Sequence, residues 1–151
     1  MAITNHRCER KGDVHLAASY GLADAKVVKL LSSRQDIDVH RKDRVRGGTP
    51  LHHASGDDRA EVVKLFLSLK DITRVNSNEG KCGGTALHWA ASTGCVEVVD
   101  FLLSYDDILV NIKERDVGAT PIHLADEKGQ TDVVKMLIED DQVDVEQGLP
   151  A

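Results

Sequence analysis

Two short apolar patterns alternate along the chain. The copies of the first are VHLAA at 14–18, TPLHHA at 49–54, TALHWA at 85–90 and TPIHLA at 120–125. The copies of the second are KVVKLL from Lys26, EVVKLFL from Glu61, EVVDFLL from Glu97 and DVVKMLI from Asp132. After each second pattern, Ile or Val alternates with polar residues and leads into a charged, glycine-containing stretch. Each unit therefore predicts two antiparallel helices, an extended arm and a hairpin-like finger.

The second pattern has an apolar side that is too wide to be buried within one pair of helices. In the copy that begins at Glu97, the apolar residues are Val98, Val99, Phe101, Leu102 and Leu103. Such a side must be covered by the units before and after it. Steps of 37, 36 and 35 residues separate the motif histidines His15, His52, His88 and His123. A period of this length is typical of a stacked array, which presents an extended surface.

The first pattern also carries residues that begin and end a helix. Thr85 is a good N-cap because its hydroxyl can accept an orphan backbone amide, and His88 is placed to reach back to it. Pro50 takes the first helical position, where a missing amide costs nothing, and Gly94 suits a left-handed cap. In the second unit the glycine is displaced to Gly56, so we expect that inner helix to be short or frayed.

These motifs resemble the ankyrin repeat, through the Thr-Pro-Leu-His-x-Ala opening, the glycine of the inner helix and the Glu-Val-Val of the outer helix. The resemblance covers roughly residues 12–146. It implies an all-α solenoid of about four helix-turn-helix units with short β-hairpin-like fingers. We expect one domain over 1–151, with repeats at approximately 12–46, 47–82, 83–117 and 118–146. Because these repeats exceed the usual length of about 33 residues, we expect slightly longer fingers.

The composition argues against nucleic-acid and membrane partners. The formal net charge is −6, which disfavours binding to a phosphate backbone. No apolar run approaches the length needed to cross a bilayer. The three cysteines, Cys8, Cys82 and Cys95, have no C-x-x-C spacing, which indicates reduced thiols. We therefore expect a monomer in the cytoplasm, with the nucleus as the alternative.

The sequence contains no motif for catalysis or for phosphate binding. No nucleophile elbow, HExxH motif or pair of catalytic carboxylates is present. The four motif histidines should lie one repeat apart along the stack, which is too far for them to share one metal ion. Their spacing from the motif threonine already explains them as capping residues. We predict no enzymatic activity, no cofactor and no metal site.

The resemblance implies recognition of another protein through the fingertips and the concave faces of the inner helices. The contact positions that it implies on the inner helices are Tyr20, Asp57, Ser92, Thr93, Glu127 and Lys128. Those that it implies on the fingers are Arg41, Lys42, Arg44, Arg46, Asn78, Glu79, Lys81, Lys113, Glu114 and Arg115. Trp89, the only tryptophan, either fills the seam between repeats or anchors a partner, and both interpretations stay open.

Asn111 occupies a position that asparaginyl hydroxylases can modify in proteins of this family. In this family an acidic residue usually lies two positions before the modified asparagine, whereas this chain has Leu109 there. We expect Asn111 to form hydrogen bonds at the base of a finger.

Three other functions remain open at the level of the sequence. The layout and repeat count are similar to those of ankyrin-type inhibitors of cyclin-dependent kinases. The chain could equally be the targeting domain of a larger enzyme or of a host-directed effector. The cations of the first finger could bind an anion, a lipid headgroup or nucleic acid, although the net acidity disfavours this.

Overall fold

The computed structural model describes residues 29–30, 33–34, 38–44, 46–69, 74–78, 80–81 and 83–146. The helices in these ranges are α3 (Pro50–Gly56), α4 (Ala60–Ser68), α5 (Ala86–Thr93), α6 (Val96–Leu103), α7 (Pro121–Glu127) and α8 (Thr131–Glu139). Within the same ranges, every helix is too short or too polar to cross a lipid bilayer. Most of the first expected repeat, including His15, lies outside the described residues, and so does Cys8, which precedes that repeat.

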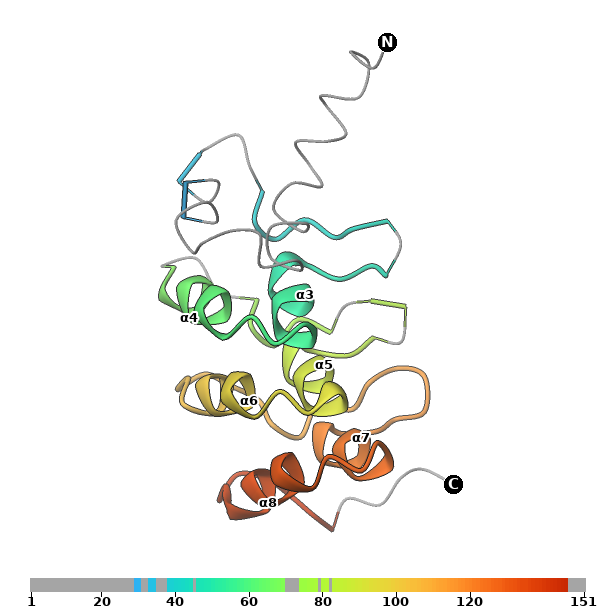
Figure 1. Ribbon diagram of the computed structural model, residues 1–151. Coiled ribbons are helices and arrows are strands. Elements are labelled where there is room, and N and C mark those ends of the chain that lie inside the picture. Colours follow the sequence, from blue (N-terminus) through green and yellow to red (C-terminus); the bar gives the residue numbers. More distant parts are fainter. Residues whose placement is uncertain are drawn as a thin grey trace.

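Helices α3 to α8 form two rows that follow the order of the chain (Figure 1). The inner row consists of α3, α5 and α7, and the outer row consists of α4, α6 and α8. Each helix contacts its partner in the pair and its neighbours along its own row. The fingers project on the side of the inner row opposite the outer row. The predicted all-α solenoid is confirmed.

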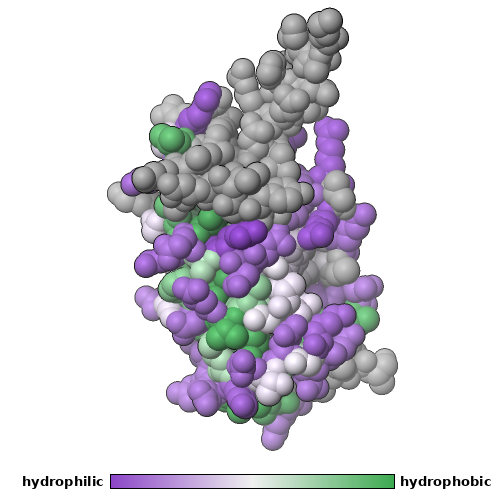
Figure 2. Space-filling view, viewed as in Figure 1, coloured by the Kyte–Doolittle hydropathy of each residue, from purple (hydrophilic) through white to green (hydrophobic). Residues whose placement is uncertain are grey.

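The core runs between the two rows without interruption from one helix pair to the next. The largest apolar side chains that are fully buried are Val63, Phe66, Leu87, Val98, Val99, Leu102, Val133 and Leu137. Figure 2 shows that hydrophilic side chains surround the apolar residues that reach the surface near the outer helices. Since every pair contributes to one shared cluster, the units stabilise each other by burying apolar area that none could bury alone.

The motif threonine and histidine begin each inner helix as expected. In α5, the backbone N–H of Thr85 donates to Nδ1 of His88 at 3.0 Å, and the Thr85 hydroxyl lies 2.8 Å from the same atom. Because Nδ1 accepts, the ring proton is on Nε2, which donates to the carbonyl of Ala119 at 3.1 Å. Equivalent boxes begin α3 and α7. Each buried histidine in this position therefore caps its own helix, and His88 also holds the next finger.

The inner helix of the second repeat differs from the sequence-based expectation. Helix α3 has seven residues, as α7 does, so it is not shortened by Gly56. The left-handed residue that follows the helix is Asp58, with φ 57°. Gly94 and Gly129 hold the corresponding place after α5 and α7, with φ 77° and 71°. The expectation was wrong because the cap is fixed by its distance from the N-cap threonine, and aspartate tolerates this conformation.

Asparagines at the base of the fingers connect successive repeats. The Asn111 side chain donates to the Gln142 carbonyl at 2.6 Å and accepts from the Asp144 amide at 2.8 Å. One repeat earlier, Asn76 makes the same pair of bonds with the Asp107 carbonyl and the Leu109 amide. The expected hydrogen-bonding role of Asn111 is confirmed.

Candidate functional site

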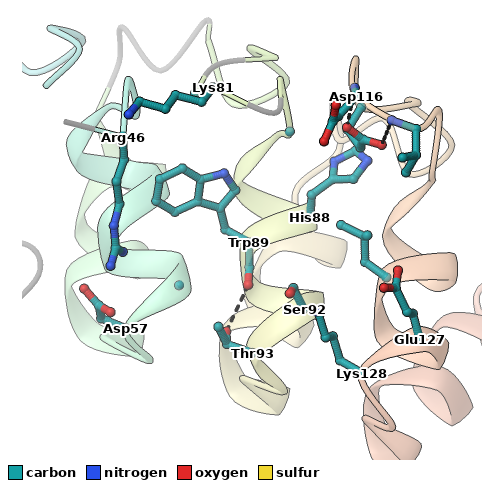
Figure 3. A pocket seen from close by; sticks show the side chains of 16 residues that line it. Arg46, Asp57, Lys81, His88, Trp89, Ser92, Thr93, Asp116, Glu127 and Lys128 are labelled. Carbon is teal, nitrogen blue, oxygen red and sulfur yellow. Dashed lines mark hydrogen bonds between the residues drawn. The ribbon is translucent and has the colours of Figure 1, made fainter. Parts of the chain in front are cut away.

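A groove of about 780 Å³ runs along the side of the inner helices that carries the fingers. We call it the Trp89 groove. Its lining includes Arg46, Asp57, Lys81, Trp89, Ser92, Thr93, Asp116, Val117, Leu124, Glu127 and Lys128. Figure 3 shows that these side chains come from three successive repeats and surround the indole of Trp89. The groove therefore exists only when the repeats are stacked.

Trp89 lies against a cradle of glycine backbone contributed by the preceding repeat and the second finger. A Cβ atom built on Gly48 would lie 2.8 Å from the indole Cη2, and one on Gly80 would lie 3.2 Å from Cζ2. A Cβ atom on Gly56 would lie 3.3 Å from Cε3. The distances at Gly48 and Gly80 are shorter than those at which non-bonded carbon atoms normally lie. Gly56, which the sequence marked as an irregularity of α3, thus gives the indole room beside that helix.

The rings of two histidines complete the seat of the indole. His52 and His53 contact Trp89 edge-on, with centroid distances of 5.4 and 5.3 Å. The indole is only partly buried, and in Figure 3 its nitrogen is on the side facing His88. Among the described residues, none accepts a hydrogen bond from this N–H. Trp89 therefore fills the seam between repeats and also presents a surface and a donor to the groove.

Charged side chains stand on both sides of the indole. Arg46 from the first finger and Lys81 from the second lie on the side of α3, where Arg46 extends toward Asp57 (Figure 3). Asp116 from the third finger and Glu127 from α7 lie on the opposite side. These four side chains are exposed. Asp57 beside Arg46 and Lys128 beside Glu127 also line the groove, so each wall carries both signs, with two cations and one carboxylate on the side of α3 and two carboxylates and one cation on the opposite side.

Predicted finger residues outside the groove connect the second finger to the third. The Asn78 side chain donates to the Lys113 carbonyl at 3.2 Å. The Arg115 guanidinium donates to the Asn78 carbonyl at 2.5 Å, and its stem lies over Gly83. These contacts fix the spacing of neighbouring fingers. The structure does not bring Arg41, Lys42 or Arg44 into the groove lining, and Tyr20 and Glu79 lie outside the described residues.

Glu114 is inside the third finger rather than at its tip. It is 5% exposed, and its carboxylate accepts the backbone amides of Asp116, Val117 and Ala119 at 2.6, 2.8 and 3.1 Å. Burial acts to raise the pKa of Glu114, but these amide bonds outweigh it and the pKa is lowered. The charge of Glu114 therefore organises the finger, and the residue is also part of the lining of the Trp89 groove. The position of Glu114 in the finger sequence could not show that its side chain is buried while those of its neighbours are exposed.

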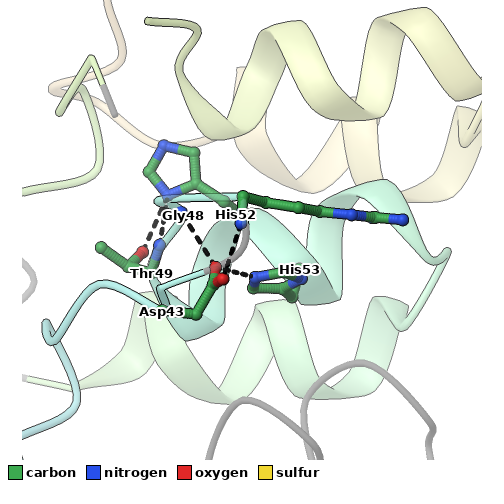
Figure 4. Close-up of polar contacts among 6 residues, drawn as sticks. Asp43, Gly48, Thr49, His52 and His53 are labelled. Atoms are coloured by element: carbon green, nitrogen blue, oxygen red, sulfur yellow. Dashed lines mark hydrogen bonds and ion pairs between the residues drawn. The ribbon is translucent and has the colours of Figure 1, made fainter. Parts of the chain in front are cut away.

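Asp43 organises the first finger in the same way, and the sequence analysis did not single it out. Its carboxylate accepts the amides of Arg46 and Gly48 at 2.7 and 3.0 Å. His53 Nε2 lies 2.6 Å from the same carboxylate (Figure 4). Asp43 precedes its motif threonine by six residues, as Glu114 does. That shared spacing is a signal that could have identified both as finger residues.

The sequence model of ankyrin repeats, in three copies, matches residues 14–114 and again residues 75–148. The chain belongs to the ankyrin-repeat family. Ankyrin repeats are generally modules for protein–protein interaction, and stacked repeats use extended concave surfaces for binding. The Trp89 groove of this ankyrin-repeat chain lies on its inner helices and fingers. A comparison with curated proteins finds no match.

Proposed function

We propose that this ankyrin-repeat chain is a non-enzymatic adaptor or inhibitor that binds one protein partner in the Trp89 groove. The observation that carries the proposal is the position of Trp89, held on the floor of a groove with charged walls. Tryptophan contributes a large contact area, and it is enriched among the residues that dominate binding energy. Ser92, Thr93 and Lys128 extend the same lining along the inner helices.

The rigidity of this site supports specific binding. The glycine cradle and the two histidine rings hold the indole in place before a partner arrives. The first and second fingers are joined through their backbones, because the amides of Gly80 and Lys81 donate to the carbonyls of Gly47 and Arg46. A preorganised surface loses little conformational entropy on association. The fingers and inner helices together could supply an interface of ordinary size, about 800 Å² per partner.

A matched pair of variants tests this proposal. Ser92→Arg places a long cation in the groove, whereas Ser68→Arg makes the same change on the exposed end of α4, in the outer row. Partner proteins are captured from the native host with wild type and with each variant, and the bound amounts are quantified. We expect Ser92→Arg to lower capture by about tenfold or more, as loss of a hot-spot contact does, and Ser68→Arg to have no effect. Equal capture by all three proteins would rule out the groove as the binding face.

A further inference from the structure

We infer that the Trp89 groove takes an extended peptide segment that carries one apolar side chain between an acidic and a basic side chain. The inference rests on the proposed function and adds the chemistry of the partner. The acidic residue would lie toward Lys81, the apolar residue on Trp89, and the basic residue toward Asp116.

The floor of the groove offers one apolar place. The larger apolar side chains of the lining are those of Trp89, Val117 and Leu124. Val117 is 57% exposed, so most of its apolar surface is available to a bound side chain. One aliphatic or aromatic side chain inserted here would bury apolar area of all three residues and would be anchored by the indole.

The free indole N–H favours a peptide in an extended conformation. Among the described residues, no side chain or carbonyl accepts this hydrogen. If a partner covered it without an acceptor, the buried donor would oppose binding. An extended segment places its own backbone carbonyls beside its side chains, with no helical partner for them. Such a carbonyl can accept the indole hydrogen while the neighbouring side chain occupies the apolar place.

The two walls set the order of the flanking charges. Lys81 and Asp116 are both exposed and stand on opposite sides of the indole (Figure 3). Their backbone amides are used within the fingers, toward the Arg46 carbonyl and the Glu114 carboxylate, so their side chains extend from rigid supports. Glu127, the last residue of α7, and Lys128, its C-cap, are neighbours of opposite charge, as Arg46 and Asp57 are on the other wall. The Lys81–Asp116 pair therefore decides which end of the peptide is acidic.

The test exchanges the two charges without changing the net charge of the protein. The double variant Lys81→Glu, Asp116→Lys alters two exposed side chains whose backbone bonds persist. Peptides are selected from a random display library on wild type and, separately, on the double variant. Each selected peptide is then titrated into both proteins. Trp89 is the only tryptophan of the chain, so its emission reports whether the groove is occupied, provided that the peptides contain no tryptophan.

We expect peptides selected on wild type to carry an acidic and a basic residue on either side of an apolar one. They should shift Trp89 emission to shorter wavelength and bind wild type about tenfold more tightly than the double variant, because like charges placed opposite each other oppose association. Peptides with the two charges exchanged should prefer the double variant. Peptides that shift the emission but bind both proteins equally would overturn the inference and leave the groove as a binding site. Selection of peptides that leave the emission unchanged, or of none, would overturn the inference and the proposed function together.

Discussion

Replacing Asp58 by glycine tests the backbone conformation that ends the inner helices. Asp58 has φ 57°, and the residues in the same place after α5 and α7 are both glycines. A left-handed conformation costs an L-residue roughly 1–2 kcal/mol. Glycine removes that cost but gives the unfolded chain more freedom, which opposes the gain by about 0.4–1 kcal/mol. The difference predicts that Asp58→Gly raises the free energy of unfolding by about 0.5–1 kcal/mol.

Two further variants separate the backbone from other effects. Gly129→Ala adds a Cβ that meets no atom within 4 Å, at φ 71°, so it measures the backbone cost alone and should destabilise by about 1 kcal/mol. Asp58→Asn keeps a side chain that tolerates the left-handed region and removes the charge. That charge acts on Cys95, whose thiol pKa is raised first by burial and then by Asp58.

The free energy of unfolding of each variant is measured by urea titration. Unfolding is monitored by far-UV circular dichroism and by the emission of Trp89. Trp89 lies at the seam between α3 and α5, so its emission reports on the unit that contains Asp58. For a chain of this length, the expected gain also raises the melting temperature by about 1–4 °C. If Asp58→Gly is no more stable than wild type while Gly129→Ala is destabilised, the assignment of a strained aspartate is wrong.

Two other predictions concern acid and the glycine cradle. Burial lowers the pKa of His88 in the folded chain, although the Ala119 carbonyl acts to raise it, so the unfolded chain binds a proton more readily there. The free energy of unfolding should therefore fall as the pH drops below 6.5, the ordinary pKa of a histidine. The lowered pKa of Glu114 should add a further loss below 4.5, the ordinary pKa of a glutamate. A urea midpoint that stays constant from neutral pH to about 4 would contradict this sign. Gly48→Ala should displace the indole, destabilise by about 1–3 kcal/mol and red-shift Trp89 emission, and unchanged emission would contradict the cradle.

The repeating part of this protein follows from short-range patterns in its amino-acid sequence. Thr85, His88 and Gly94 specify the start and end of a helix through contacts with residues nearby in the chain. The wide apolar side of α6 can be buried only by neighbouring helices, so stacking follows from the same short pattern. The hydrogen bonds of Asn111 also followed from its place in the repeat. Local chemistry, repeated in register, was sufficient for these features because each copy makes the same contacts.

The features that distinguish one repeat from the next depend on how the repeats pack together. The seat of Trp89 needs Gly48 and Gly80, which belong to the preceding repeat and have other local roles as turn residues. Glu114 looked like an exposed finger charge until folding placed three amides around its carboxylate. Such contacts join residues from different repeats, and their energies depend on distances that exist only after the repeats have packed together.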